Sequence, residues 1–132
     1  IAMKPGRPLA VGKIGPALFF GLPGNPVSVM VTFYQFVLPA LRKLSGEQNI
    51  SSFRCSARVT HRLNKRPGRT EFQRGFLSLD GHGELTVKNT GEQGSGILSS
   101  MNRANCFVIL SVDSDGADIG DVVTVEPFAG LI

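Results

Sequence analysis

The strongest periodic signal in the chain is a long apolar segment that follows an Asn-Pro pair. Asn25 is a candidate N-cap, and Pro26 falls at the first helical position, where a missing N–H loses no partner. Residues 27–44 are apolar on nearly every side, which predicts a helix covered by other elements on several sides. The pattern therefore predicts one long helix from Pro26 to Leu44, with a bend near Pro39.

Short apolar runs bounded by Gly and Pro precede this helix. Residues 9–13 and 17–20 are candidate strands, and residues 1–3 are predicted to end another strand before a rigid loop over residues 4–8. Strands this short need neighbours that the sequence does not supply. We therefore expect the chain to be a fragment of a longer protein.

Beyond Gly46 the apolar period changes from helical to two. Phe53, Cys55, Ala57 and Val59 alternate with cationic and hydroxyl residues, which predicts a half-buried strand. Further strands, two of them flanking a hairpin turn, are predicted over residues 69–79, 85–88, 106–112 and 122–125. The predicted fold class is α+β, with the long helix in residues 1–46 and an all-β barrel or sandwich in residues 47–132.

Composition bounds the class of protein. The chain has 132 residues, of which 42% are apolar and 18% charged, with 16 Gly and 8 Pro, as expected of a small, turn-rich globular protein. Its two cysteines and two isolated histidines form no disulfide framework or zinc motif, so we expect no metal site in this segment. No apolar run is long enough for a membrane span, and a soluble, cytoplasmic protein is the expectation.

Charge is distributed unevenly about a net value of +4. Seven of the 14 cations lie within residues 54–74, whereas five of the 10 acids lie in the last 20 residues, where there is no cation. Two interpretations remain open. The fold brings the two stretches together as ion pairs, or the cations form a surface for RNA or another polyanion.

A glycine-rich junction precedes the long helix. In Phe20-Gly-Leu-Pro-Gly-Asn-Pro-Val-Ser28, Gly21 and Gly24 allow close approach to the backbone, and the N–H groups at the helix start favour an anion. The Lys of a Walker loop is absent. The junction is either an anion site or a rigid turn that leads into a buried helix.

Other candidate anion contacts lie outside this junction. Lys4 and Arg7 flank a stiff Pro-Gly pair and are either anion contacts or an exposed pair at a strand end. Strand alternation places Arg74 on one face with Phe72 and Phe76, where a guanidinium needs an anionic partner. Ser95, between two glycines, is either an anion contact or part of a turn. No catalytic triad or carboxylate pair is present, so the segment is built to bind anions rather than to catalyse alone.

Several short motifs together resemble one family, the molybdopterin molybdenumtransferases (MoeA), whose eukaryotic counterpart is the E domain of gephyrin. In chain order they are Lys4-Pro-Gly-Arg-Pro8, Phe20-Gly-Leu-Pro-Gly-Asn-Pro-Val-Ser28, Pro67-Gly-Arg69, Phe72-Gln-Arg-Gly75, Gly94-Ser95 and Val125-Glu-Pro-Phe128. The resemblance covers essentially the whole chain. It implies that residues 1–46 end a molybdopterin-binding-like α/β domain and that residues 47–132 form a barrel-like C-terminal domain.

The same resemblance implies a function. The family inserts molybdenum from molybdate into adenylylated molybdopterin and releases AMP, with Mg²⁺ whose ligands are expected upstream of this segment. It implies a homodimer, with molybdopterin-adenylyltransferase as a candidate partner. It implies no binding to a membrane or to nucleic acid. The site residues that it implies in this chain are Lys4, Arg7, Pro23, Gly24, Asn25, Pro26, Ser28, Arg74 and Ser95.

Two other functions compete with this one. A basic β-barrel that binds RNA is the first, although the sequence shows no row of aromatic residues for stacking bases. A scaffold role like that of gephyrin is the second, and no motif of this chain marks a receptor-binding groove.

Overall fold

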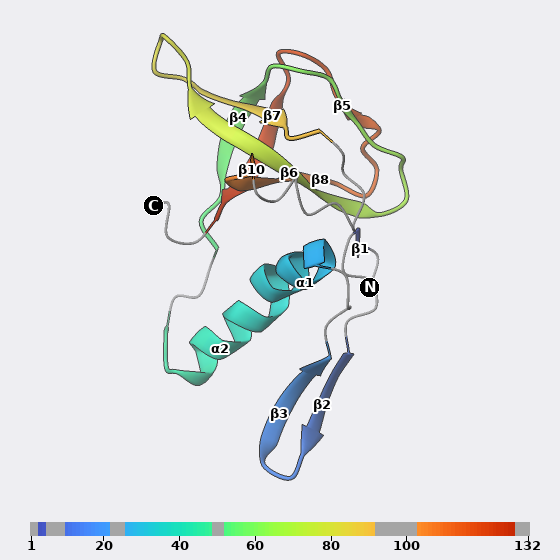
Figure 1. The fold of residues 1–132 in the computed structure, drawn as a ribbon, viewed down its shortest axis with the longest axis vertical. Coiled ribbons are helices and arrows are strands. Elements are labelled where there is room, and N and C mark those ends of the chain that lie inside the picture. Colours follow the sequence, from blue (N-terminus) through green and yellow to red (C-terminus); the bar gives the residue numbers. More distant parts are fainter. Residues whose placement is uncertain (1–2, 5–9, 22–25, 49–51, 92–102, 129–132) are drawn as a thin grey trace.

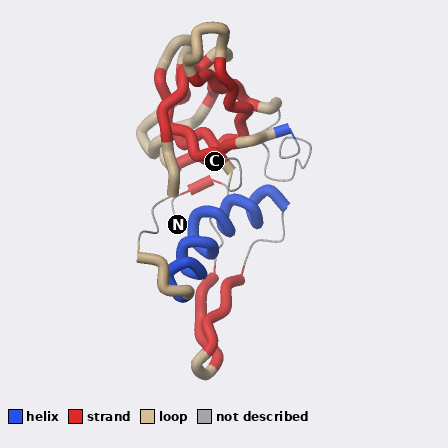
Figure 2. Tube along the Cα trace, turned by 90° about the vertical axis from the view of Figure 1, so that its left-hand side faces the viewer, coloured by secondary structure: helices blue, strands red, loops and turns tan. Residues whose placement is uncertain are grey.

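The computed structural model describes residues 3–4, 10–21, 26–48, 52–91 and 103–128. A closed β-barrel occupies one end of the molecule, a long helix lies beside it, and a β-hairpin projects at the opposite end (Figure 1). The same three parts follow one another in the perpendicular view (Figure 2).

The helix is continuous but changes its hydrogen-bond pattern in the middle. It consists of α1 (Pro26–Thr32), a π-helical turn η1 (Phe33–Val37) and α2 (Leu38–Leu44). The N–H of Leu38 donates to the carbonyl of Phe33, five residues back. Pro39 has no N–H for the usual bond four residues back, and the wider turn directly before it accommodates that loss. The predicted helix over residues 26–44 is confirmed.

Only part of the helix is covered. Val31 and Val37 are buried, but Leu41 and Leu44 are 46% and 65% exposed. The expectation of a helix covered on several sides is therefore wrong for its last turns. The physical reason is that the barrel packs against the first half of the helix, around Val31.

The projecting hairpin pairs β2 (Ala10–Ile14) with β3 (Ala17–Gly21) in antiparallel register. Both predicted strands are therefore present. They form a two-stranded sheet of their own. Four of its larger apolar side chains are exposed: Val11, Ile14, Leu18 and Phe19.

The β-domain was predicted to be a barrel or a sandwich, and the structure shows a barrel. Its five strands pair in the order β6 (Thr70–Leu79), β7 (Leu85–Asn89), β4 (Cys55–Val59), β10 (Val122–Pro127) and β8 (Cys106–Leu110). β8 pairs with β6 and closes the ring, which removes free sheet edges. Outside the ring, β1 (Met3–Lys4) adds to β6 in parallel, and β5 (Leu63–Asn64) pairs with β9 (Gly116–Ala117).

Alternate residues of the barrel strands fill its interior. Ala57 and Val59 point inward as the period of two predicts, together with Val87, Val108 and Val125. Phe53 does not: it lies before β4 and is 54% exposed, so its predicted place in the strand is wrong. The alternation of apolar and polar residues begins before β4, at Phe53, but strand pairing begins only at Cys55.

No helix among the described residues is long and apolar enough to cross a lipid bilayer.

Candidate functional site

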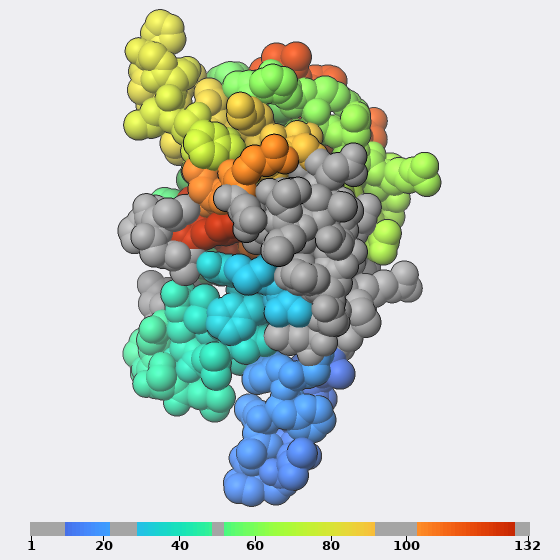
Figure 3. Space-filling model, in the orientation of Figure 1, coloured from blue at the N-terminus to red at the C-terminus, as the bar shows by residue number. Residues whose placement is uncertain are grey.

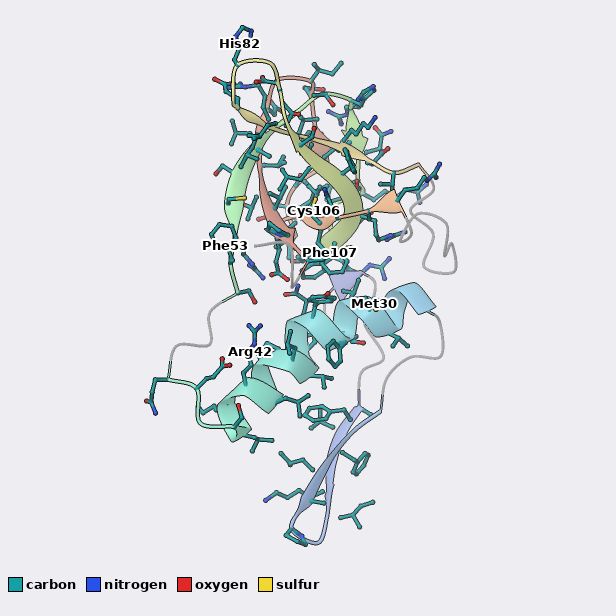
Figure 4. All side chains as sticks on the ribbon, turned by 60° about the vertical axis from the view of Figure 1, so that its left-hand side comes forward. Met30, Arg42, Phe53, His82, Cys106 and Phe107 are labelled. Atoms are coloured by element: carbon teal, nitrogen blue, oxygen red, sulfur yellow. The ribbon has the colours of Figure 1, made fainter. Side chains whose placement is uncertain are left out.

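An aromatic cluster joins the helix to the outside of the barrel. Phe72 of β6 and Phe107 of β8 point outward and pack against Val31 of α1. Tyr34 meets Phe107 edge-on and stacks on Phe128, with ring centroids 5.7 and 5.6 Å apart. In Figure 4, Phe107 lies on the helix side of the barrel and Cys106, its neighbour in β8, lies within the barrel. This cluster determines which side of the barrel the helix covers.

Arg74 lies on that same outer side and is almost fully buried. It is 1% exposed, lies two residues along β6 from Phe72, and is the cross-strand partner of Phe107 in β8. Burial lowers the pKa of its guanidinium, and the negative charge of Glu71 opposes that shift. Gln73 points to the other face, as strand alternation predicts, and its amide donates to Asn64 and Glu71.

Two other predicted site elements lie within the described residues. Lys4 of β1 pairs with Glu71 of β6, which places its backbone three residues along the strand from Arg74. Three strand residues span about 10 Å. The helix start predicted at Pro26 is the first residue of α1, and Ser28 lies in its first turn. The predicted contacts outside the described residues are Arg7, Pro23, Gly24, Asn25 and Ser95.

The Val125-Glu-Pro-Phe128 motif has a structural role in this arrangement. Glu126, 4% exposed, accepts hydrogen bonds from Arg54 Nε at 3.1 Å and from Gln35 Nε2 at 3.0 Å. Arg54 also donates to Gln35 Oε1 at 3.1 Å, which closes a three-residue ring between barrel and helix. Sequence reasoning did not assign Glu126 a partner, because the three residues are distant along the chain.

Two of the seven clustered cations pair with acids of the C-terminal stretch. Arg54 reaches Glu126 and Arg62 reaches Asp118, with N–O distances of 3.1 and 2.6 Å. Buried Lys65 donates from Nζ to three backbone carbonyls. The fold brings the two charged stretches side by side, as one interpretation expected, through two ion pairs and through contacts of cations with backbone carbonyls. These contacts use cations that the RNA-binding interpretation needs free.

A second polar site escaped the sequence analysis. His61, Arg62, Lys88 and Arg103 line a hollow of about 630 Å³ beside the exposed ring of Phe76. Phe76 pairs with Lys88 through the β6–β7 register, and Arg103 precedes β8. Lys88 and Arg103 belong to no charge cluster or motif of the sequence, so only strand pairing brings them together.

Within the described ranges, no three His, Cys, Asp or Glu side chains come together in a group that could hold a metal ion. The cationic and aromatic lining instead suits anions.

The architecture defines a small closed β-barrel domain with a helix docked on its outer face. Residues 56–128 match the family described as MoeA C-terminal region (domain IV). The chain therefore belongs to this family.

Individual relatives extend the likeness over the whole chain. It is 44% identical over 133 residues to a molybdopterin molybdenumtransferase of Haemophilus influenzae, covering 100% of this chain and 33% of that protein. It is 34% identical to gephyrin of Dictyostelium discoideum, covering 93% of this chain and 20% of the relative. A molybdopterin biosynthesis MoeA structure from Pyrococcus horikoshii superposes with a TM-score of 0.73 at 31% identity, over 96% of this chain and 31% of that one.

Proposed function

We propose that this chain forms the C-terminal part of a molybdopterin molybdenumtransferase, which inserts molybdenum from molybdate into adenylylated molybdopterin and releases AMP. The observation that carries the proposal is the family match combined with Arg74, a desolvated cation beside the helix and close along β6 to Lys4. The enzyme relative named above is 44% identical over this entire chain.

The residues of this chain would act by binding and orienting anions. Molybdate and the phosphates of the pterin are negatively charged. Lys4, Arg7, the N-terminus of α1 and Arg74 would offset that charge, and Ser95 would add a hydroxyl contact. Pro23, Gly24, Asn25, Pro26 and Ser28 would shape the backbone cradle at the helix start. Holding the two reactants together supplies the entropic part of the rate enhancement.

The remaining parts of the proposal concern segments and partners outside this chain. We propose a cytoplasmic homodimer in which this barrel faces the α/β domain of the other subunit. Mg²⁺ would be held by carboxylates upstream of this segment, as the family resemblance implies. Residues 1–46 would end the α/β domain, and molybdopterin-adenylyltransferase would supply the adenylylated substrate.

Paired substitutions in the full-length enzyme test the site. Arg74→Ala should lower turnover about ten- to a hundredfold, because a charge-assisted contact to an anion contributes about 1.5–3 kcal/mol. Arg58→Ala is the control: its side chain is half exposed and donates to Gly120 O, and its loss should change stability by about 0.5 kcal/mol or less. Turnover is compared at equal folded fraction, measured by circular dichroism. Equal effects of the two substitutions would remove Arg74 from the site.

The isolated 132-residue chain provides a further test. It should not insert molybdenum, because the proposed upstream carboxylates and half of the cleft are not in this sequence. Turnover of adenylylated molybdopterin with molybdate by this chain alone would contradict the proposed division of the site.

A further inference from the structure

A carboxylate, Glu71, lies on β6 among the cations of the proposed anion site. It is three residues along the strand from Arg74 and is the parallel strand partner of Lys4 in β1. It also lines a hollow of about 540 Å³. The other charged residues in the described walls of this hollow are Lys65, Arg66 and Arg69. A single negative charge therefore lies in a cationic neighbourhood.

Glu71 is not neutralised by an ion pair within the described part of the chain. The four ion pairs found there involve other carboxylates. Lys65 donates from Nζ to backbone carbonyls instead, and Arg66 and Arg69 are exposed at the surface. The negative charge of Glu71 is therefore left to act on the groups around it.

A buried amide holds this carboxylate in place. Gln73 is 2% exposed, and its Nε2 donates to Glu71 Oε1 at 3.1 Å and to the carbonyl of Asn64 at 2.7 Å. Its Oε1 is buried and has no hydrogen-bond partner among the described residues. The opposite orientation of the amide would place that oxygen against two acceptors. Gln73 thus fixes the position of Glu71 without cancelling its charge.

The charge of Glu71 extends to Arg74. Burial lowers the pKa of the Arg74 guanidinium, and the negative charge of Glu71 raises it. The same charge repels an anion that binds at Arg74, because water screens charges only weakly where the groups are partly buried. Glu71 therefore favours the charged form of the guanidinium and at the same time opposes its anionic ligand.

We propose that Glu71, held by Gln73, is a specificity-determining residue that limits the affinity of the site for small oxyanions. This inference rests on the proposed function, in which Arg74 and Lys4 contact anions. Tight binding of a small oxyanion occupies a site without accelerating the reaction. Repulsion from Glu71 weakens ligands that make few contacts, whereas a larger substrate gains further contacts elsewhere in the cleft.

Two substitutions of Glu71 in the full-length protein test the inference, with affinities for molybdate and sulfate measured by calorimetry. Glu71→Gln should bind both anions about three- to tenfold more tightly, because it removes a nearby negative charge. Glu71→Asp keeps the charge and should stay within about twofold of the wild type. A purely structural role predicts the reverse order, because Gln preserves the length of the side chain and Asp does not.

A substitution of Gln73 tests whether the amide acts through the carboxylate. Gln73→Met removes the donor to Glu71, and it also removes the unpartnered oxygen, so the barrel should keep its fold. It should tighten molybdate binding by less than Glu71→Gln does, because the carboxylate is still present. Added to Glu71→Gln, it should change the affinity no further.

Glu84→Gln is the matched control. The carbonyl of Glu84 accepts from Asp80 N–H in the turn after β6, at the opposite end of that strand from Glu71. In Figure 3 the yellow surface of this turn and the lime-green surface that leads into β6 lie on opposite sides of the molecule. This variant should leave both affinities unchanged.

The outcomes separate this inference from the proposed function. Unchanged affinities in Glu71→Gln, equal tightening by Glu84→Gln, or tighter binding in Glu71→Asp alone would overturn the inference. A wild-type protein that binds molybdate but does not convert adenylylated molybdopterin would contradict the proposed function and leave the inference standing. A wild-type protein that binds neither anion would overturn both.

Discussion

At the scale of single residues, the structure distinguishes buried charges from exposed ones. Glu126 is 4% exposed and is held by Arg54 and Gln35, whereas Glu84 is largely exposed near Arg58. Exposed ion pairs contribute little to stability because water screens them, but a buried carboxylate depends on its hydrogen-bond donors. The two glutamates therefore differ in their expected contribution to folding.

Replacing these two carboxylates one at a time tests that difference. Glu126→Gln should lower the free energy of unfolding by about 1–2 kcal/mol, because it removes a charge-assisted bond at the helix–barrel joint. Glu84→Gln is the control and should change it by less than about 0.5 kcal/mol. Urea denaturation followed by circular dichroism measures both. Equal losses would show that the Arg54–Glu126–Gln35 ring does not stabilise the joint.

At the scale of elements, β6 determines most of the architecture. It pairs with three strands: with β7 in a hairpin, with β8 to close the barrel, and with β1 near the N-terminus of the chain. Its outward side chains contact the helix, and its inward positions include Gly75. A Cβ at Gly75 would lie 2.9 Å from Val108 and 3.1 Å from Val87, so the barrel is closed tightly around this glycine.

Adding one methyl group at Gly75 tests the packing at this position. Gly75→Ala should destabilise the barrel by about 1–3 kcal/mol, because the surrounding valines must move. Gly81→Ala, in the β6–β7 turn with nothing within 4 Å of its Cβ position, is the control and should stay within about 0.5 kcal/mol. Thermal unfolding measures both. A Gly75→Ala protein as stable as the control would refute the tight closure.

At the scale of the whole molecule, the barrel closes with its own strands while the helix attaches from outside. The five ring strands all lie within residues 55–127, and the helix contributes Val31 and Tyr34 to the aromatic cluster on the outer face. This organisation agrees with the predicted boundary near Gly46, which remains a prediction.

A truncated chain tests the boundary. Residues 47–132 alone should fold cooperatively with a β-type circular dichroism spectrum, because every ring pairing is retained. The truncated chain should have a lower melting temperature than the 132-residue chain. It should also bind more of a hydrophobic dye, because Phe72 and Phe107 are no longer covered by the helix. A truncated chain without a cooperative transition would place residues 1–46 within the folding unit.

Local sequence patterns determined the helix over residues 26–44 and most of the strands. The spacing of apolar residues and the turn-forming residues act between near neighbours in the sequence. They can therefore be recognised without knowing the tertiary structure. The same locality explains the error at Phe53, where the alternation of side chains extends beyond the residues that actually pair. Arg74 is predictable for the same reason, because its position between Phe72 and Phe76 is a local feature.

Tertiary structure alone decided which distant residues meet. Barrel closure through β6 and β8, the Arg54–Glu126–Gln35 ring and the hollow with Lys88 and Arg103 all join segments that are far apart in the sequence. Such contacts depend on strand register and on the face that each side chain takes. A shift of one residue in register would turn every side chain of a strand to the opposite face. Composition and spacing in the sequence therefore cannot predict these long-range contacts.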